Sequence, residues 1–180
     1  MLEEYPLRPH VRWTERTTLP SGAITEEPME EVWRPVKGAV PSWLVTTTTR
    51  PRTATARALV ARYELRALGL VCAGTSAREE PAEITPAKLV LPRVPRIGTS
   101  WRGIHRVRGH NVERACALVD HAACEGGLEL RCTVEEGDTV TEVKNRYCRG
   151  IGIVGYVSRT TRGAEVVTVE SRDLVDVPGT

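Results

Sequence analysis

The chain has 180 residues, enough to bury roughly 70% of its unfolded surface, so it needs neither a metal ion nor a disulfide merely to fold. Its formal net charge of +2 by itself indicates neither nucleic-acid nor membrane binding. No apolar run approaches the ~20 residues of a membrane-spanning helix. Phe is absent, so the core must come from Val, Leu, Ile and Ala, with four Trp and four Tyr as the bulky side chains. Val and Thr are abundant, and both favour strands.

The first half of the chain reads as short strands separated by proline and glycine turns. Pro6 and Pro9 limit regular structure in the opening segment. Strands are expected at 13–18, 31–36, 42–49, 55–63 and 68–73. The stretch 81–95 carries Pro81, Pro86, Pro92 and Pro95, and is expected to be a linker.

The second half repeats this character. The second copy begins with the segment from Ile97 to Trp101, and strands are expected at 127–134, 140–147, 151–158 and 164–170, with a hairpin turn at 135–138. Leu128, Leu130, Cys132 and Val134 alternate on one face of the first of these strands. The segment 111–126 fits either a strand or a helix capped by Asn111 and Gly126; we favour the strand.

Three matches, at a spacing of about 85 residues, indicate a tandem duplication. Thr55 to Tyr63, followed by Ala67-Leu-Gly-Leu-Val71, corresponds to Thr139 to Tyr147, followed by Gly150-Ile-Gly-Ile-Val154. The segment that ends at Trp13 corresponds to the one that ends at Trp101. We expect a mainly β protein of two similar antiparallel modules, 1–80 and 96–180, packed as a sandwich or curved half-barrel within one compact domain or two.

The paired positions of the two copies are expected to be structural anchors. Trp13 and Trp101 would each fill the core of one module, while Trp33 and Trp43 are freer to be exposed. Tyr63 and Tyr147 are the matched tyrosines, and Gly69 and Gly152 the matched glycines. The letters Gly150-x-Gly152-x-x-Gly155 fit a phosphate loop, but a strand-like sequence follows them, so a bend in a strand is the better interpretation.

These motifs resemble those of a loose group of uncharacterised bacterial secreted proteins and lipoproteins. Their modules open with P-L-x-x-G-x-x-W and close with an aromatic residue and G-x-G-x-V. Here the opening is Pro6-Leu7 with Trp13, then Gly98 with Trp101, and the closing is Tyr147 with Gly150 to Val154; His10 replaces the opening Gly of the first copy. The resemblance implies a β-rich envelope protein, periplasmic or an outer-membrane lipoprotein, and no particular activity. Membrane contact would need a lipid anchor that this chain lacks, and a native start at Met1 would indicate the cytoplasm.

The five cysteines leave at least one thiol unpaired in a monomer. In an oxidising compartment Cys116 could pair with Cys132 or with Cys148, and the sequence does not choose between them. A zinc site at Cys116, His121, Cys124 and Cys132 is the less favoured alternative, because no C-x-x-C pair is present. We assign no metal and no cofactor.

A window from Ile84 to Val112 contains no Asp or Glu. Its arginines are the candidate partner-binding residues: Arg93, Arg96, Arg102, Arg106 and Arg108. The last three would share one strand face and could meet an acidic partner, although a plain solvated face is the favoured interpretation.

No catalytic motif is recognisable, and the basic run lacks the interleaved aromatic residues of a nucleic-acid surface. We therefore expect a non-enzymatic envelope-associated binding or structural protein, with a protein partner or an apolar ligand. The alternatives are a scaffold that docks an acidic partner near Trp101 and, third, a metal- or thiol-dependent enzyme.

Overall fold

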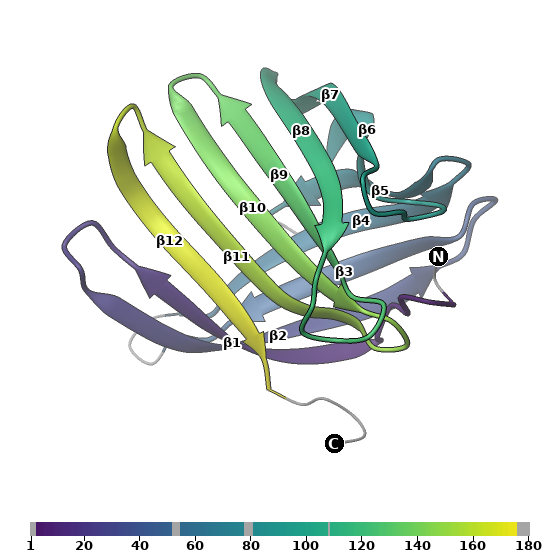
Figure 1. The fold of residues 1–180 in the computed structure, drawn as a ribbon, viewed down its shortest axis with the longest axis horizontal. Helices are drawn as coiled ribbons and strands as arrows, with labels where there is room; N and C mark the ends of the chain where they lie inside the picture. Colours follow the sequence, from purple (N-terminus) through teal and green to yellow (C-terminus); the bar gives the residue numbers. More distant parts are fainter. Residues whose placement is uncertain (1–2, 52–54, 78–80, 108, 176–180) are drawn as a thin grey trace.

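The computed structural model describes residues 3–51, 55–77, 81–107 and 109–175. In that part of the chain, twelve antiparallel strands form one closed barrel (Figure 1). Each strand pairs with its neighbours in the chain, and β12 returns to pair with β1. The strands are β1 (His10–Thr18), β2 (Ile24–Val36), β3 (Ser42–Thr49), β4 (Arg57–Arg66), β5 (Gly69–Ser76), β6 (Ala82–Pro92), β7 (Ser100–Val107), β8 (His110–Asp120), β9 (Leu128–Glu136), β10 (Thr139–Cys148), β11 (Gly152–Arg162) and β12 (Glu165–Leu174).

The alternation of side chains along each strand determines which face lies inside the barrel. In β9, Leu128, Leu130 and Cys132 are buried in the core, as the sequence pattern predicted, while Arg131 is exposed. The turn between β9 and β10 reverses at Gly137-Asp138, within the predicted hairpin turn.

The prediction of a mainly β, antiparallel protein is confirmed, but the predicted sandwich or half-barrel is wrong. The first sequence copy, 1–80, supplies β1 to β5, and the second copy, 96–180, supplies β7 to β12. Both belong to the same closed sheet, with β6 between them. Closure pairs the outer strands of the two halves of the sheet, β1–β6 and β7–β12: β1 pairs with β12 at six positions, and β6 pairs with β7 at two. Two modules packed face to face would have left those edges unpaired.

The predicted linker at 81–95 is also wrong, because residues 82–92 form β6. β6 pairs with β7 only at Ile84 and Thr85, immediately before Pro86. Beyond Thr85, β6 forms no backbone pairs with β7, so its prolines remove no hydrogen bond between these two strands. A strand can therefore tolerate a proline content that suggested a linker.

The segment from 110 to 120 is a strand, as favoured over the helix. Arg114, Cys116 and Leu118 alternate as buried residues along β8, which is the period of a strand and not of a helix. The remaining residues, 121–127, form a turn-rich connection that leads into β9.

Two local features recur at equivalent places in the two halves. A register shift follows Arg62 in β4 and Arg146 in β10, each immediately before a matched tyrosine. Gly69 and Gly152 have positive φ angles of 140° and 89°. A Cβ atom on Gly69 would collide with the carbonyl oxygen of Leu91, and one on Gly152 with that of Pro6. The internal repeat therefore coincides with repeated backbone geometry.

The N-terminal segment closes one end of the barrel. The Tyr5 hydroxyl donates to the carbonyl of Gly126 at 2.9 Å, and the Arg8 Nε donates to the carbonyl of Ile151 at 2.8 Å. The backbone N–H of Gly150 donates to the carbonyl of Glu4 at 2.6 Å. This segment, the 121–127 connection and the β10–β11 turn thus meet at the same end (Figure 1). No helix with the length and hydropathy of a membrane span occurs within the described ranges.

Candidate functional site

The barrel encloses a cavity of about 290 Å³, which is our candidate functional site. Inward-facing side chains of β1, β2, β4, β5, β6 and β8 to β12 line it, together with the N-terminal segment. This volume lies at the lower end of the range for small-molecule sites. It equals the share of about ten water molecules in the liquid.

Most of the cavity wall is apolar or aromatic. Aliphatic residues come from six of the strands and from the N-terminal segment: Leu7, Val11, Leu70, Val90, Leu91, Val134, Val143 and Ile153. Trp33 stacks on Tyr63 with ring centroids 4.9 Å apart, and Tyr5 meets Tyr147 edge-on at 6.3 Å. Such a wall suits the hydrocarbon or ring portion of a ligand.

Two basic side chains of the wall have no acidic partner. Arg114 of β8 is buried, and its guanidinium donates to the carbonyl of Leu89 at 2.6 Å and to the Sγ of Cys132 at 3.0 Å. Lys88 of β6 is half-buried, and its ammonium group makes no hydrogen bond or ion pair with any residue that the structure describes. The charges of both groups are therefore uncompensated by the described residues.

The other charged groups of the wall are already engaged. Arg172 forms an ion pair with Glu15 at 2.9 Å and lies 4.5 Å from the ring centre of Tyr156. Glu31, the acidic residue of the wall, accepts a hydrogen bond from the Trp33 indole at 2.5 Å. Glu31 is thus held by the neighbouring tryptophan and makes no ion pair with Lys88 or Arg114.

Burial is the main cause of the pKa shifts in the cavity. It raises the pKa of Tyr147 to about 12 and that of Tyr63 well above its usual value. It raises the pKa of the Glu31 carboxyl and lowers that of the Lys88 ammonium, with the nearby Arg114 contributing to the second effect. Each shift disfavours the charged form, as expected in a poorly solvated interior.

The basic side of the cavity lies beside the weakest seam of the barrel. β6 and β7 share two residue pairs, whereas β8 and β9 share eight. Beyond the two pairs, side chains bridge toward β6: the His105 Nδ1 lies 2.8 Å from the carbonyl of Pro86, and Arg114 donates to Leu89. Lys88 lies in the part of β6 that forms no backbone pairs with β7.

Comparisons with known proteins assign the chain to no group. No family model matches it, and neither the curated proteins nor the solved structures contain a match. The resemblance to bacterial envelope proteins stays a prediction.

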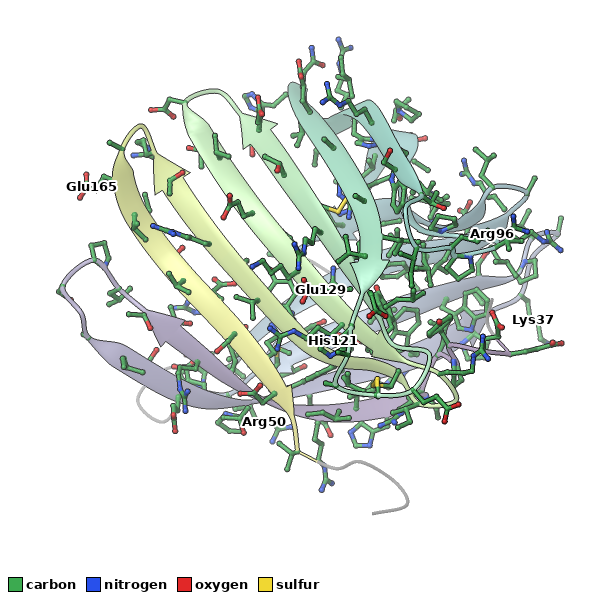
Figure 2. All side chains as sticks on the ribbon, in the orientation of Figure 1. Lys37, Arg50, Arg96, His121, Glu129 and Glu165 are labelled. Carbon is green, nitrogen blue, oxygen red and sulfur yellow. A yellow bond between two sulfur atoms is a disulfide. The ribbon has the colours of Figure 1, made fainter. Side chains whose placement is uncertain are left out.

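The predicted partner-binding arginines lie outside this cavity. Arg102 and Arg106 are exposed on β7, with the exposed Ile104 between them, and Trp101 and His105 occupy the opposite face. Arg93 and Arg96 are exposed in the connection between β6 and β7, and Figure 2 shows Arg96 on the outside of the barrel. Arg108 lies outside the described residues.

The structure pairs four of the five cysteines. Cys116 is bonded to Cys132, directly across the β8–β9 ladder, which is one of the two pairings left open. Cys148 pairs with Cys124 instead of Cys116, because the 121–127 connection brings Cys124 to the end of β10. Cys72 is a buried free thiol.

The predicted alternative of a zinc site or thiol enzyme at these cysteines does not fit this arrangement. Cys116, Cys124 and Cys132 are all oxidised and offer no thiolate ligand or nucleophile. Among the described residues, no group of three or more His, Cys, Asp or Glu is placed to hold a metal ion. His121 lies in the connection at the barrel end (Figure 2).

The predicted anchors lie in or beside the core. Trp13 and Tyr147 are buried, while Trp101 and Tyr63 are partly buried against the core. The expectation that Trp33 is freer to be exposed is wrong, because it faces the cavity from β2 and stacks on Tyr63.

Three polar residues of the cavity escaped the sequence analysis as site candidates. Lys88 fell in the supposed linker, and Arg114 in the segment left between strand and helix. Glu31 lay at the start of a predicted strand, two residues before Trp33. The alternation of these residues with their neighbours was the available signal, but it did not show which face would be enclosed.

Proposed function

We propose that this protein is a non-enzymatic binding protein that holds a small apolar or amphipathic molecule inside its barrel. The observation that carries the proposal is the enclosed cavity of about 290 Å³ with its mainly aliphatic and aromatic wall. An eight-stranded barrel has an interior just wide enough for side chains or one small ligand, and diameter grows with strand number. A twelve-stranded barrel therefore has room for a ligand as well as its core.

The two disulfides support an envelope or secreted location for this binding protein. Cys116–Cys132 and Cys124–Cys148 would persist in an oxidising compartment and be reduced in the bacterial cytosol. The location is thus part of the proposal and agrees with what the sequence resemblance implies.

The test is binding of 1-octanol, a neutral probe of about the cavity's size, followed by tryptophan fluorescence. Trp13 and Trp33 both line the cavity and should report occupancy. Val134→Phe should abolish the signal by filling the space, whereas Ile104→Phe, on the exposed face of β7, should leave it unchanged. Equal binding by the two variants, or no binding to the unaltered protein, would contradict the proposal.

A second candidate function is docking of an acidic partner on the outside of β7. It is favoured by the four arginines Arg93, Arg96, Arg102 and Arg106, which are exposed and form no ion pair with any described residue. The double variant Arg102→Glu/Arg106→Glu should abolish salt-sensitive binding to polyglutamate. Unchanged binding, or none to the unaltered protein, would dismiss this candidate.

A further inference from the structure

The chemical class of the ligand follows from the unequal charge of the cavity wall. Arg8, Lys88, Arg114 and Arg172 line it, against a single carboxylate, that of Glu31. Arg172 is neutralised by Glu15, and Arg8 donates to the carbonyl of Ile151. Lys88 and Arg114 form no ion pair with the described residues, and we therefore place the excess positive charge on these two groups.

This excess charge is costly without a counter-ion. A buried charge without a counter-ion loses its hydration and gains no compensating attraction. Arg114 recovers part of this through its bonds to Leu89 and Cys132, whereas Lys88 has no hydrogen bond to the described residues. Burial lowers the pKa of Lys88, and the nearby Arg114 adds to this effect. An anion placed between them would relieve both effects.

The neighbouring polar groups can also donate hydrogen bonds. The hydroxyls of Tyr63 and Tyr147 line the same cavity and make no hydrogen bond with the described residues, and burial keeps both protonated. The indole N–H of Trp13 is buried without a hydrogen-bond acceptor. Donors in excess of acceptors suit a carboxylate, which only accepts.

We propose that the barrel binds a small amphipathic carboxylate, with its anionic group at Lys88 and Arg114 and its hydrocarbon portion against the aliphatic wall. This inference rests on the proposed function and names the ligand class of the same cavity. The volume limits the ligand to about ten non-hydrogen atoms, each taken as the size of a water molecule. Octanoate has this size, and octanamide matches its shape without the charge.

The experiment compares octanoate with octanamide by tryptophan fluorescence titration of the full chain at neutral pH. We expect the unaltered protein to bind octanoate at least about tenfold more tightly, because a hydrogen bond to a charged group exceeds its neutral counterpart by that factor or more. Lys88→Met should remove this preference and leave octanamide binding within about twofold. The control Lys37→Met removes an exposed lysine outside the barrel (Figure 2) and should change neither affinity.

The outcomes separate the ligand class from the proposed function. If octanamide binds as tightly as octanoate, or if Lys88→Met weakens both equally, carboxylate recognition is refuted while the binding function stands. If neither compound nor octanol binds, the binding function fails and the inference fails with it. Thermal melts establish that each variant is folded, and Lys88→Gln serves as a second neutral variant should Lys88→Met not fold.

Discussion

Replacing Gly69 with alanine should be among the most damaging single-methyl changes in this barrel. Gly69 begins β5 with φ of +140°, a conformation that residues with a side chain rarely adopt. Holding an alanine in this backbone conformation costs about 2 kcal/mol. The new Cβ would collide with the carbonyl oxygen of Leu91 and crowd the backbone of Pro92 and Arg93. Backbone atoms held in a sheet cannot rotate away, so overpacking adds about 2 kcal/mol.

The expected loss is therefore about 4 kcal/mol, or about 12 °C in Tm for a chain of this size. Gly152→Ala has φ of +89° and the equivalent collision with Pro6, but Pro6 precedes β1 and can shift more easily. It should lower Tm by about 8 °C. The control Gly163→Ala has φ of +57° with open space around it, and should lower Tm by about 3 °C.

The assay is thermal unfolding followed by circular dichroism, with urea unfolding to check that the slope m is unchanged between variants. The order of the three losses is the test, because positive φ is common to all of them and the collision is not. If Gly69→Ala has the same Tm as Gly163→Ala, the close approach of β5 to the end of β6 is refuted. A Gly152→Ala loss equal to that of the control would likewise refute the packing of the N-terminal segment on β11.

Further predictions concern the cysteines and a buried tyrosine. Thiol titration of the denatured, unreduced protein should find one free thiol per chain, that of Cys72; five would contradict both disulfides. Cys124→Ala/Cys148→Ala opens a loop of 24 residues and should reduce the free energy of unfolding by about 3 kcal/mol in urea titrations; an unchanged midpoint would exclude a stabilising bridge. Burial raises the pKa of Tyr147 from 10.0 to about 12, so the unfolded chain loses this proton first and stability falls as the pH rises through that interval. In alkaline urea titrations, the free energy of unfolding of Tyr147→Phe should fall by up to about 3 kcal/mol less than that of the unaltered protein over this pH interval. An equal decline in both proteins would refute the pKa shift.

Much of the secondary structure could be read directly from the residues. The alternation of Leu128, Leu130 and Cys132 specifies which side of β9 is apolar, and a strand with this period must bury that side. The matched glycines, Gly69 and Gly152, pointed to equivalent bends in the two halves, and the structure places both at crowded backbone contacts. These are local properties of the chain.

The candidate site could not be read in this way. Nothing local to Lys88 distinguishes a basic residue in a linker from one that faces a cavity, because the distinction depends on whether β6 joins the sheet. Arg114 becomes a candidate site residue only because β8 places it beside Leu89, in the part of β6 that forms no backbone pairs with β7. The arginines that looked prominent, such as Arg102 and Arg106, are the ones that remain on the outside.

The sequence by itself determined the strand character of the chain, the apolar side of β9 and the repeat between the two halves, because each depends on neighbouring residues and backbone preference. Only the tertiary structure decided that the halves close into one barrel, how the cysteines pair and which cations face its interior. Those outcomes depend on contacts between β1 and β12 and between β6 and β7, where residues distant in sequence or separated by a weak seam must meet. Closure of the barrel turns the apolar faces of its strands into the wall of a cavity. The charged groups on this wall lose hydration only because the barrel closes around them.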